Sequence, residues 1–143
     1  RYRGLAEHLN KKYQANIVVL GGQHEISLGN EVISGLPSNH CFNACGVLTL
    51  LETAELLRQA SLLIANSTGT IHLGAAVGVP CVGLYTIRDI PGKWSPYGMG
   101  HRVLYHLNLS CNYKSEACIN KSIDAITVDE VCRQCEEMLS KKS

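Results

Sequence analysis

Short apolar runs alternate along the chain with longer segments in which apolar residues recur every three or four positions. Runs of this length that are bounded by turn residues predict buried strands, and the clearest lie at residues 17–20, 62–65 and 81–85. Weaker strands are expected near residues 41–45 and 101–105. The helical spacing predicts amphipathic helices at residues 2–13, 26–36 and 50–60, and at the C-terminal end from residue 127, and a small-residue segment closed by Gly78 predicts a further helix at 71–77. This alternation predicts an α/β fold, a Rossmann-like open parallel sheet with helices on both faces.

Local signals mark several helix ends. The spacings Thr49 to Glu52 and Thr127 to Glu130 each predict a capping box that opens a helix. Gly78, followed by Pro80, predicts the end of the helix at residues 71–77. We expect residues 87–100, rich in Gly and Pro, to form a long loop that contacts substrate or closes over it. Residues 106–126 are predicted to be irregular.

Composition narrows the class of protein. The chain has 143 residues, of which 45% are hydrophobic and 17% charged, and this predicts one globular domain with its own core. A net charge of +1 argues against a nucleic-acid partner. No apolar run approaches the roughly 20 residues that span a membrane. Seven scattered cysteines favour a reducing, cytoplasmic setting over a disulfide framework. Because the chain starts inside a predicted helix and without Met, we expect it to be a fragment of a longer protein.

The most informative stretch is the central turn, residues 66–69, where a predicted strand gives way to a predicted helix. Such a turn presents free backbone N–H groups and the positive end of a helix dipole, which together attract an anion. Thr68 adds a hydroxyl, Gly69 permits close approach, and His72 lies one turn into the helix. The sequence favours a phosphate site here; an ordinary Ser/Thr cap beside a packed histidine is the alternative.

Two further features follow other predicted strands. Gly21 and Gly22 end the first strand, and Glu25 is placed to accept hydrogen bonds from hydroxyl groups of a ligand. Leu48 lies where it could flank a flat ring. Alternatively, Glu25 simply stabilises a helix N-terminus after a tight turn, and Leu48 is a hydrophobic staple. In an open parallel sheet the carboxyl ends of the strands share one edge, so we expect these residues and the central turn to line it.

A metal site is a weaker hypothesis. It would use the C-terminal cysteines, of which Cys132 and Cys135 share a C-x-x-C spacing. Cys111 and Cys118 are seven residues apart, whereas tetrahedral zinc sites generally show tighter pairs. A buried helix face explains Cys135 adequately, so no metal is expected.

Several motifs resemble glycosyltransferase family 9, the ADP-heptose:lipopolysaccharide heptosyltransferases. They are GGQHE (residues 21–25), NSTGTIHLGAA (66–76), GVP (78–80), WSPYG (94–98) and CINKSI (118–123). The resemblance covers nearly the whole chain and the family's C-terminal half, which binds the donor. It implies the C-terminal half of a glycosyltransferase-B fold, with residues 1–143 as the nucleotide-sugar domain and an N-terminal acceptor domain absent from this chain.

The resemblance also implies the roles of individual residues. Thr68, Gly69 and His72 would hold the diphosphate of the donor, Glu25 the ribose hydroxyls, and Leu48 would lie against adenine. The implied reaction is inverting transfer of heptose from ADP-heptose to the lipopolysaccharide inner core, with no metal or other cofactor. The acceptor, a lipid A–core oligosaccharide, would bind through the missing domain, with peripheral contact at the inner membrane.

By the same resemblance Ser67 is a further donor-binding residue. The chain departs from the family there, because the family usually has Asp at this position. The catalytic base and a phosphate-binding lysine lie upstream in the family, so we expect no catalytic residue in this fragment, which alone would bind and not catalyse. Two alternatives remain open: an inactive nucleotide-sugar-binding module, and an enzyme that uses another sugar-nucleotide donor.

Overall fold

The computed structural model describes residues 1–89, 92–106 and 115–140. The chain divides into two compact units, Arg1–Thr53 and Ala54–Ser143, and each is described by itself. All the paired strands are parallel, and the α/β class predicted from the sequence is confirmed. Among the described residues the strands form two sheets, of which β1 and β2 make one and β3, β4 and β5 the other.

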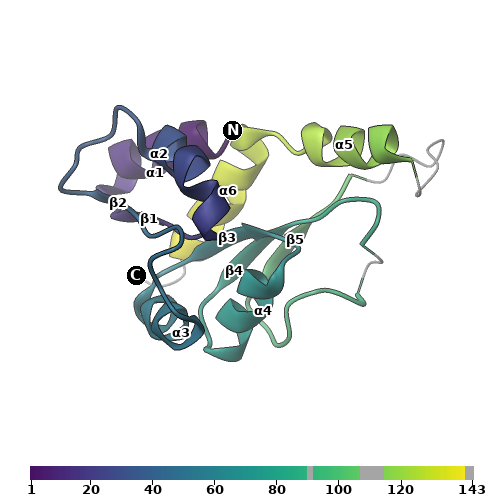
Figure 1. Ribbon diagram of the computed structural model, residues 1–143. Helices are drawn as coiled ribbons and strands as arrows, with labels where there is room; N and C mark the ends of the chain where they lie inside the picture. The colour runs from purple at the N-terminus through teal and green to yellow at the C-terminus, as the bar shows by residue number, and fades with distance from the viewer. Residues whose placement is uncertain (90–91, 107–114, 141–143) are drawn as a thin grey trace. The chain divides into compact units, whose positions relative to one another are not determined.

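The first unit is a small sheet with two helices (Figure 1). Its elements are α1 (Tyr2–Tyr13), β1 (Ile17–Val19), the 3₁₀ turn η1 (Gln23–Glu25), α2 (Ile26–Ile33) and β2 (Cys41–Asn43). Asn43 ties β2 to α2, since its amide nitrogen donates to the carbonyl of Ile26 and to Asn30 Oδ1, at 2.9 and 2.8 Å. A Cβ at Gly29 would collide with the Asn43 side chain, so this glycine allows α2 to pack closely on the strand.

The second unit holds a three-stranded parallel sheet between helices. Its strands are β3 (Leu63–Asn66), β4 (Cys81–Leu84) and β5 (Arg102–Leu104). The central strand β4 has three consecutive buried residues, Cys81, Val82 and Gly83, as expected where both faces are covered. The covering helices are α4 (Gly69–Ala76) and α6 (Val128–Leu139), which lie on opposite sides of the sheet (Figure 1).

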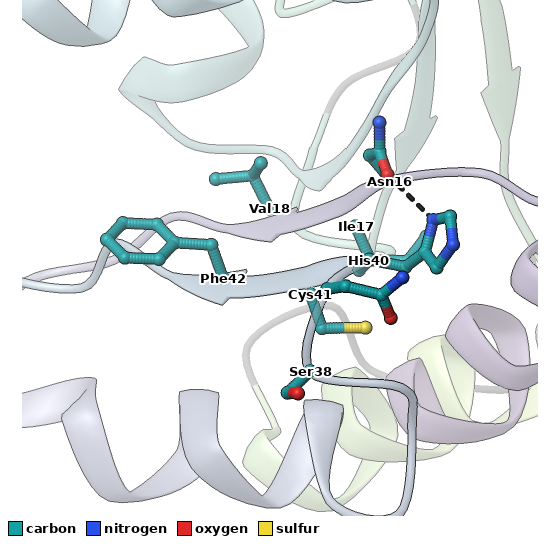
Figure 2. Close-up of a pocket in the computed structure, with 8 residues that line it drawn as sticks. Asn16, Ile17, Val18, Ser38, His40, Cys41 and Phe42 are labelled. Carbon is teal, nitrogen blue, oxygen red and sulfur yellow. Dashed lines mark hydrogen bonds between the residues drawn. The ribbon is translucent and has the colours of Figure 1, made fainter.

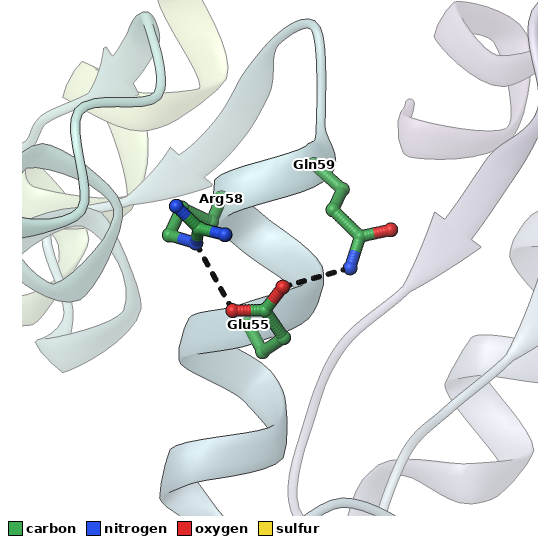
Figure 3. A network of polar contacts seen from close by, with 3 residues as sticks. All are labelled: Glu55, Arg58 and Gln59. Carbon is green, nitrogen blue, oxygen red and sulfur yellow. Dashed lines mark hydrogen bonds and ion pairs between the residues drawn. The ribbon is translucent and has the colours of Figure 1, made fainter.

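Helix α3 (Leu50–Gln59) crosses the boundary between the units, and its predicted capping box is confirmed. Thr49 Oγ1 accepts from the Glu52 N–H at 3.3 Å, and the Glu52 carboxylate accepts from the Thr49 N–H at 2.7 Å. On its exposed face Glu55 accepts from Arg58 and from Gln59, both at 3.0 Å (Figure 3). Exposed pairs of this kind add little stability, so burial of Leu57 is the larger contribution of this helix to the fold.

The predicted glycine stop of α4 is also confirmed. Gly78 has a φ of +84°, and its N–H donates to the carbonyl of Ala75. The N–H of Val79 donates to the carbonyl of Gly74, and together these bonds form a Schellman motif. Gly74 also lets α4 lie close to the sheet, because a Cβ there would collide with Leu63. The helix begins at Gly69, slightly earlier than predicted.

The structure differs from the prediction for residues 106–126. Residues 106–126 were expected to be irregular, but the structure has a helix, α5 (Glu116–Ala125). Its buried stripe includes Ser122, whose hydroxyl accepts from the Ile87 N–H at 3.0 Å and donates to the Ile119 carbonyl at 2.7 Å. Because the buried Ser122 is polar, the apolar residues of this segment do not show a clear helical spacing in the sequence.

The second predicted capping box is only half formed. Thr127 accepts from the Glu130 N–H, as predicted, but the Glu130 carboxylate bonds the imidazole of His106 at 2.8 Å. No described helix is both long and apolar enough to cross a membrane.

Candidate functional site

The central turn joins β3 to α4 at the carboxyl end of its strand. Ser67 is held there by its N–H, which donates to the carbonyl of Leu84 at 3.2 Å. Thr68 is the N-cap of α4, with the extended φ of −136° and ψ of 173° typical of that position. Its hydroxyl, however, caps none of the described backbone N–H groups. Thr68 thus occupies the N-cap position without the side-chain bond of an ordinary threonine cap.

Gly69 leaves space beside these backbone groups. Apart from its chain neighbours and the adjoining helix backbone, no heavy atom of the described residues lies within 4 Å of the position that a Cβ at Gly69 would take. Gly74 and Gly83 differ from Gly69, because a Cβ at either would collide with a neighbouring side chain. An exposed backbone at a helix N-terminus leaves its N–H groups accessible to an anion.

His72 lies one turn into α4 and is half-buried. Its ring meets the ring of Trp94 edge-on, with centroids 6.4 Å apart and planes at 61°. Trp94 is 49% exposed, and the ammonium of Lys93 lies 5.7 Å from the centroid of its ring. The predicted loop therefore does flank the central turn, and it brings an aromatic ring and a cation to that side of the unit.

Tyr85 connects this loop to the sheet. Its side chain is fully buried, and its hydroxyl donates to the Trp94 carbonyl at 2.7 Å. Burial raises the pKa of Tyr85 to about 12, the nearby Tyr105 and Asp89 add to the rise, and a hydrogen bond from Ser67 opposes it. Sequence reasoning missed this tyrosine, because its position at the end of an apolar run suggested only a strand residue.

The other predicted site residues lie in the first unit. Glu25 Oε2 accepts from the Gly22 N–H at 2.7 Å, so this carboxylate caps its own turn, as one interpretation held. The side chain nevertheless remains 46% exposed. The loop after β2 packs on this turn, since Gly46 donates to the Gly21 carbonyl at 2.9 Å and has a φ of +71°. Leu48, partly buried, follows that loop.

A hollow of about 290 Å³ lies elsewhere in the first unit (Figure 2). Its lining includes His40, whose Nδ1 is 2.9 Å from Asn16 Oδ1, and the strand residues Val18 and Phe42. Residues 16 and 38–40 precede β1 and β2, so much of this hollow lies toward the amino ends of the strands. Parallel sheets bind ligands at the opposite edge, and for that reason we do not identify this hollow as the site.

The metal hypothesis gains no support from the described residues, among which no three His, Cys, Asp or Glu side chains are arranged to hold an ion. Cys111, one of its four cysteines, lies outside the described residues. Cys135 is fully buried in α6, and burial raises the pKa of its thiol to about 12, with Cys132 adding to the rise. A thiol that resists ionisation is a poor metal ligand.

Together, the parallel sheets and the flanking helices define a Rossmann-like α/β protein, in which the central turn opens helix α4. The sequence model of glycosyltransferase family 9 (heptosyltransferase) matches residues 1–123. The chain belongs to this family.

Individual relatives agree with this assignment. The chain is 32% identical over 88 residues to the lipopolysaccharide heptosyltransferase 2 of Salmonella typhimurium, and 30% identical over 87 residues to the lipooligosaccharide heptosyltransferase 2 of Haemophilus influenzae. Each match covers 59% of this chain and 25% of the relative. The aligned part thus spans about a quarter of the length of these curated proteins.

Two solved structures share the fold. The Escherichia coli ADP-heptose lipopolysaccharide heptosyltransferase II superposes with a TM-score of 0.82 at 24% identity, over 99% of this chain and 41% of that one. A family 9 glycosyl transferase from Veillonella parvula gives the same TM-score and identity over 98% of this chain and 40% of its own. The predicted fold class is confirmed.

Proposed function

We propose that this chain forms the donor-binding part of a glycosyltransferase that uses ADP-heptose. The observation that carries the proposal is the N-terminal end of α4, where Thr68 leaves its hydroxyl uncommitted and Gly69 faces open space. Family membership supplies the chemical class of the ligand, a sugar nucleotide. A diphosphate fits such a turn because several N–H groups and the helix dipole favour its charge.

In this proposal each predicted residue has a distinct task. Thr68 and Gly69 bind the diphosphate through the hydroxyl and the backbone, and His72 approaches it from the first turn of α4. Glu25 binds the ribose hydroxyls through the exposed part of its carboxylate, and Leu48 lies against adenine. Ser67 supports the turn from below, next to Tyr85.

The reaction is heptose transfer with inversion at the anomeric carbon. A hydroxyl of the lipopolysaccharide inner core attacks that carbon, and the bond to the diphosphate breaks. Negative charge then grows on the leaving ADP, so fixed backbone N–H donors and an N–H of the His72 imidazole stabilise the transition state more than the ground state. We expect no metal to take part, and the acceptor to bind outside these residues, with peripheral contact at a membrane.

Ser67 favours a second candidate, a module that binds sugar nucleotides without turnover. Serine is uncharged, so it cannot supply the negative charge that the family's usual Asp would bring to this turn. A transfer assay separates the two candidates. Glycosyltransfer predicts that the intact protein releases ADP from ADP-heptose in the presence of an acceptor and of EDTA. Tight binding without release would indicate the module, and release of UDP from a UDP-sugar would indicate a different donor.

Binding itself is tested by calorimetry on the 143-residue chain. ADP should bind more tightly than AMP, because only ADP presents a diphosphate to the turn. Equal affinities would remove the diphosphate from the proposal.

A further inference from the structure

Tyr85 lies beside Ser67 of the proposed site, and the proposed function gives it no task of its own. It follows β4 immediately, and its N–H donates to the Leu104 carbonyl at 3.0 Å, so its backbone is fixed by the sheet. A Cβ at Gly83 would collide with its ring and would approach Ile71 to 3.2 Å. The ring therefore folds back over Gly83 toward α4, and this glycine makes the space for it.

The hydroxyl of Tyr85 is the link to the loop. Its 2.7 Å bond to the Trp94 carbonyl has the usual length of an O–H···O bond and is part-buried, and it fixes the backbone from which the Trp94 ring projects. That ring meets the edge of His72. One phenol thus connects the sheet to the loop, and the loop to the histidine of the proposed site.

We propose that Tyr85 is a positioning residue of the anion site, which holds Trp94 against His72 and so fixes the direction in which the imidazole points. This inference rests on the proposed function, since the anion is the diphosphate of the donor. A half-exposed histidine on a helix surface samples several rotamers, and ordering it on binding would weaken affinity. A ring held beside it lowers that cost before the ligand arrives.

Tyr105 offers a matched control. Its ring lies 5.2 Å from that of Tyr85, so both belong to one aromatic pair. Among the described residues its buried hydroxyl has no hydrogen-bond partner of good geometry, although Ser95 lies near enough to oppose part of the rise that burial produces in the pKa of Tyr105. Removing this hydroxyl should therefore leave the loop in place.

The test compares Tyr85→Phe and Tyr105→Phe in the 143-residue chain. Trp94 is the single tryptophan, so its fluorescence reports on the loop without any ligand. We expect Tyr85→Phe to fold cooperatively, to make Trp94 more accessible to acrylamide quenching, and to weaken ADP binding roughly three- to tenfold, as the loss of one hydrogen bond does. Binding of AMP should change less, and Tyr105→Phe should match the wild type in every measurement.

Wild-type quenching together with wild-type ADP affinity in Tyr85→Phe would overturn the inference. If the wild-type chain binds no ADP, the proposed function fails, while the quenching comparison still decides whether Tyr85 holds Trp94. If Tyr85→Phe does not fold, Trp94→Leu takes its place. That variant should fold and lose ADP affinity, and unchanged affinity would contradict a role for the loop.

Discussion

Gly69→Ala separates stability from binding at the proposed diphosphate site. Gly69 is the first residue of α4, and a methyl group added there would meet no described heavy atom within 4 Å. The free protein therefore accommodates the change without strain. A ligand that lies on the backbone at this position would meet the methyl group directly.

The stability of the variant should rise slightly. Replacing Gly by Ala where the native dihedrals suit Ala stabilises by about 0.4–1 kcal/mol, because the unfolded chain loses conformational freedom. For a domain of this size that corresponds to an increase in melting temperature of roughly 1–4 °C.

Binding should weaken strongly in the same variant. Displacing the diphosphate from one charge-assisted hydrogen bond costs about 1.5–3 kcal/mol, so the dissociation constant for ADP should rise by roughly 10- to 150-fold. Calorimetric titration with ADP measures this directly, and thermal unfolding followed by circular dichroism gives the stability.

Gly78→Ala is the matched control at the other end of α4. A methyl group there also meets no described heavy atom within 4 Å, but Gly78 has a φ of +84°. A left-handed alanine costs about 1–2 kcal/mol, so this variant should melt lower and bind ADP normally. If Gly69→Ala binds ADP as tightly as the wild type, the phosphate does not approach this backbone and the reasoning is refuted.

Three further predictions concern single side chains. His72→Ala should leave the melting temperature almost unchanged and weaken ADP binding by roughly tenfold or more; early melting with normal binding would make His72 structural. Because burial raises the pKa of Cys135 from 9.0 to about 12, only the unfolded chain ionises between these values, and the free energy of unfolding should fall as pH rises. Urea melts at pH 8 and 10 should show this loss, and Cys135→Ala should reduce it. Thr49→Ala should destabilise by about 0.5–2 kcal/mol through loss of its cap, whereas an unchanged urea midpoint would contradict that bond.

The features predicted correctly from the sequence depend on neighbours within a few residues. The box of Thr49 and Glu52 and the stop at Gly78 need only the helix that they bound, so the local pattern was sufficient. The turn at residues 66–69 follows equally from a strand that passes into a helix. The second capping box was predicted only in part, because the Glu130 carboxylate bonds the distant His106 instead of the N-terminus of its own helix.

The contacts that were missed join segments whose relation depends on the conformation of a loop. The sequence predicted a loop that contains Trp94, but nothing in the pattern indicated that Tyr85 would hold its carbonyl or that His72 would face its ring. Helix α5 was missed for a related reason, since its buried Ser122 bonds the Ile87 N–H, a contact between distant segments that the local pattern does not show.

The most direct test of the central claim is an amide chemical-shift titration of the isotope-labelled chain with ADP. If the central turn binds the diphosphate, the largest saturable shifts fall on the amides of residues 68–72, and AMP at the same concentrations moves them less. Shifts that saturate elsewhere, for example around the hollow lined by residues 16–18 and 38–42, or amides at residues 68–72 that do not respond to ADP, would contradict the account.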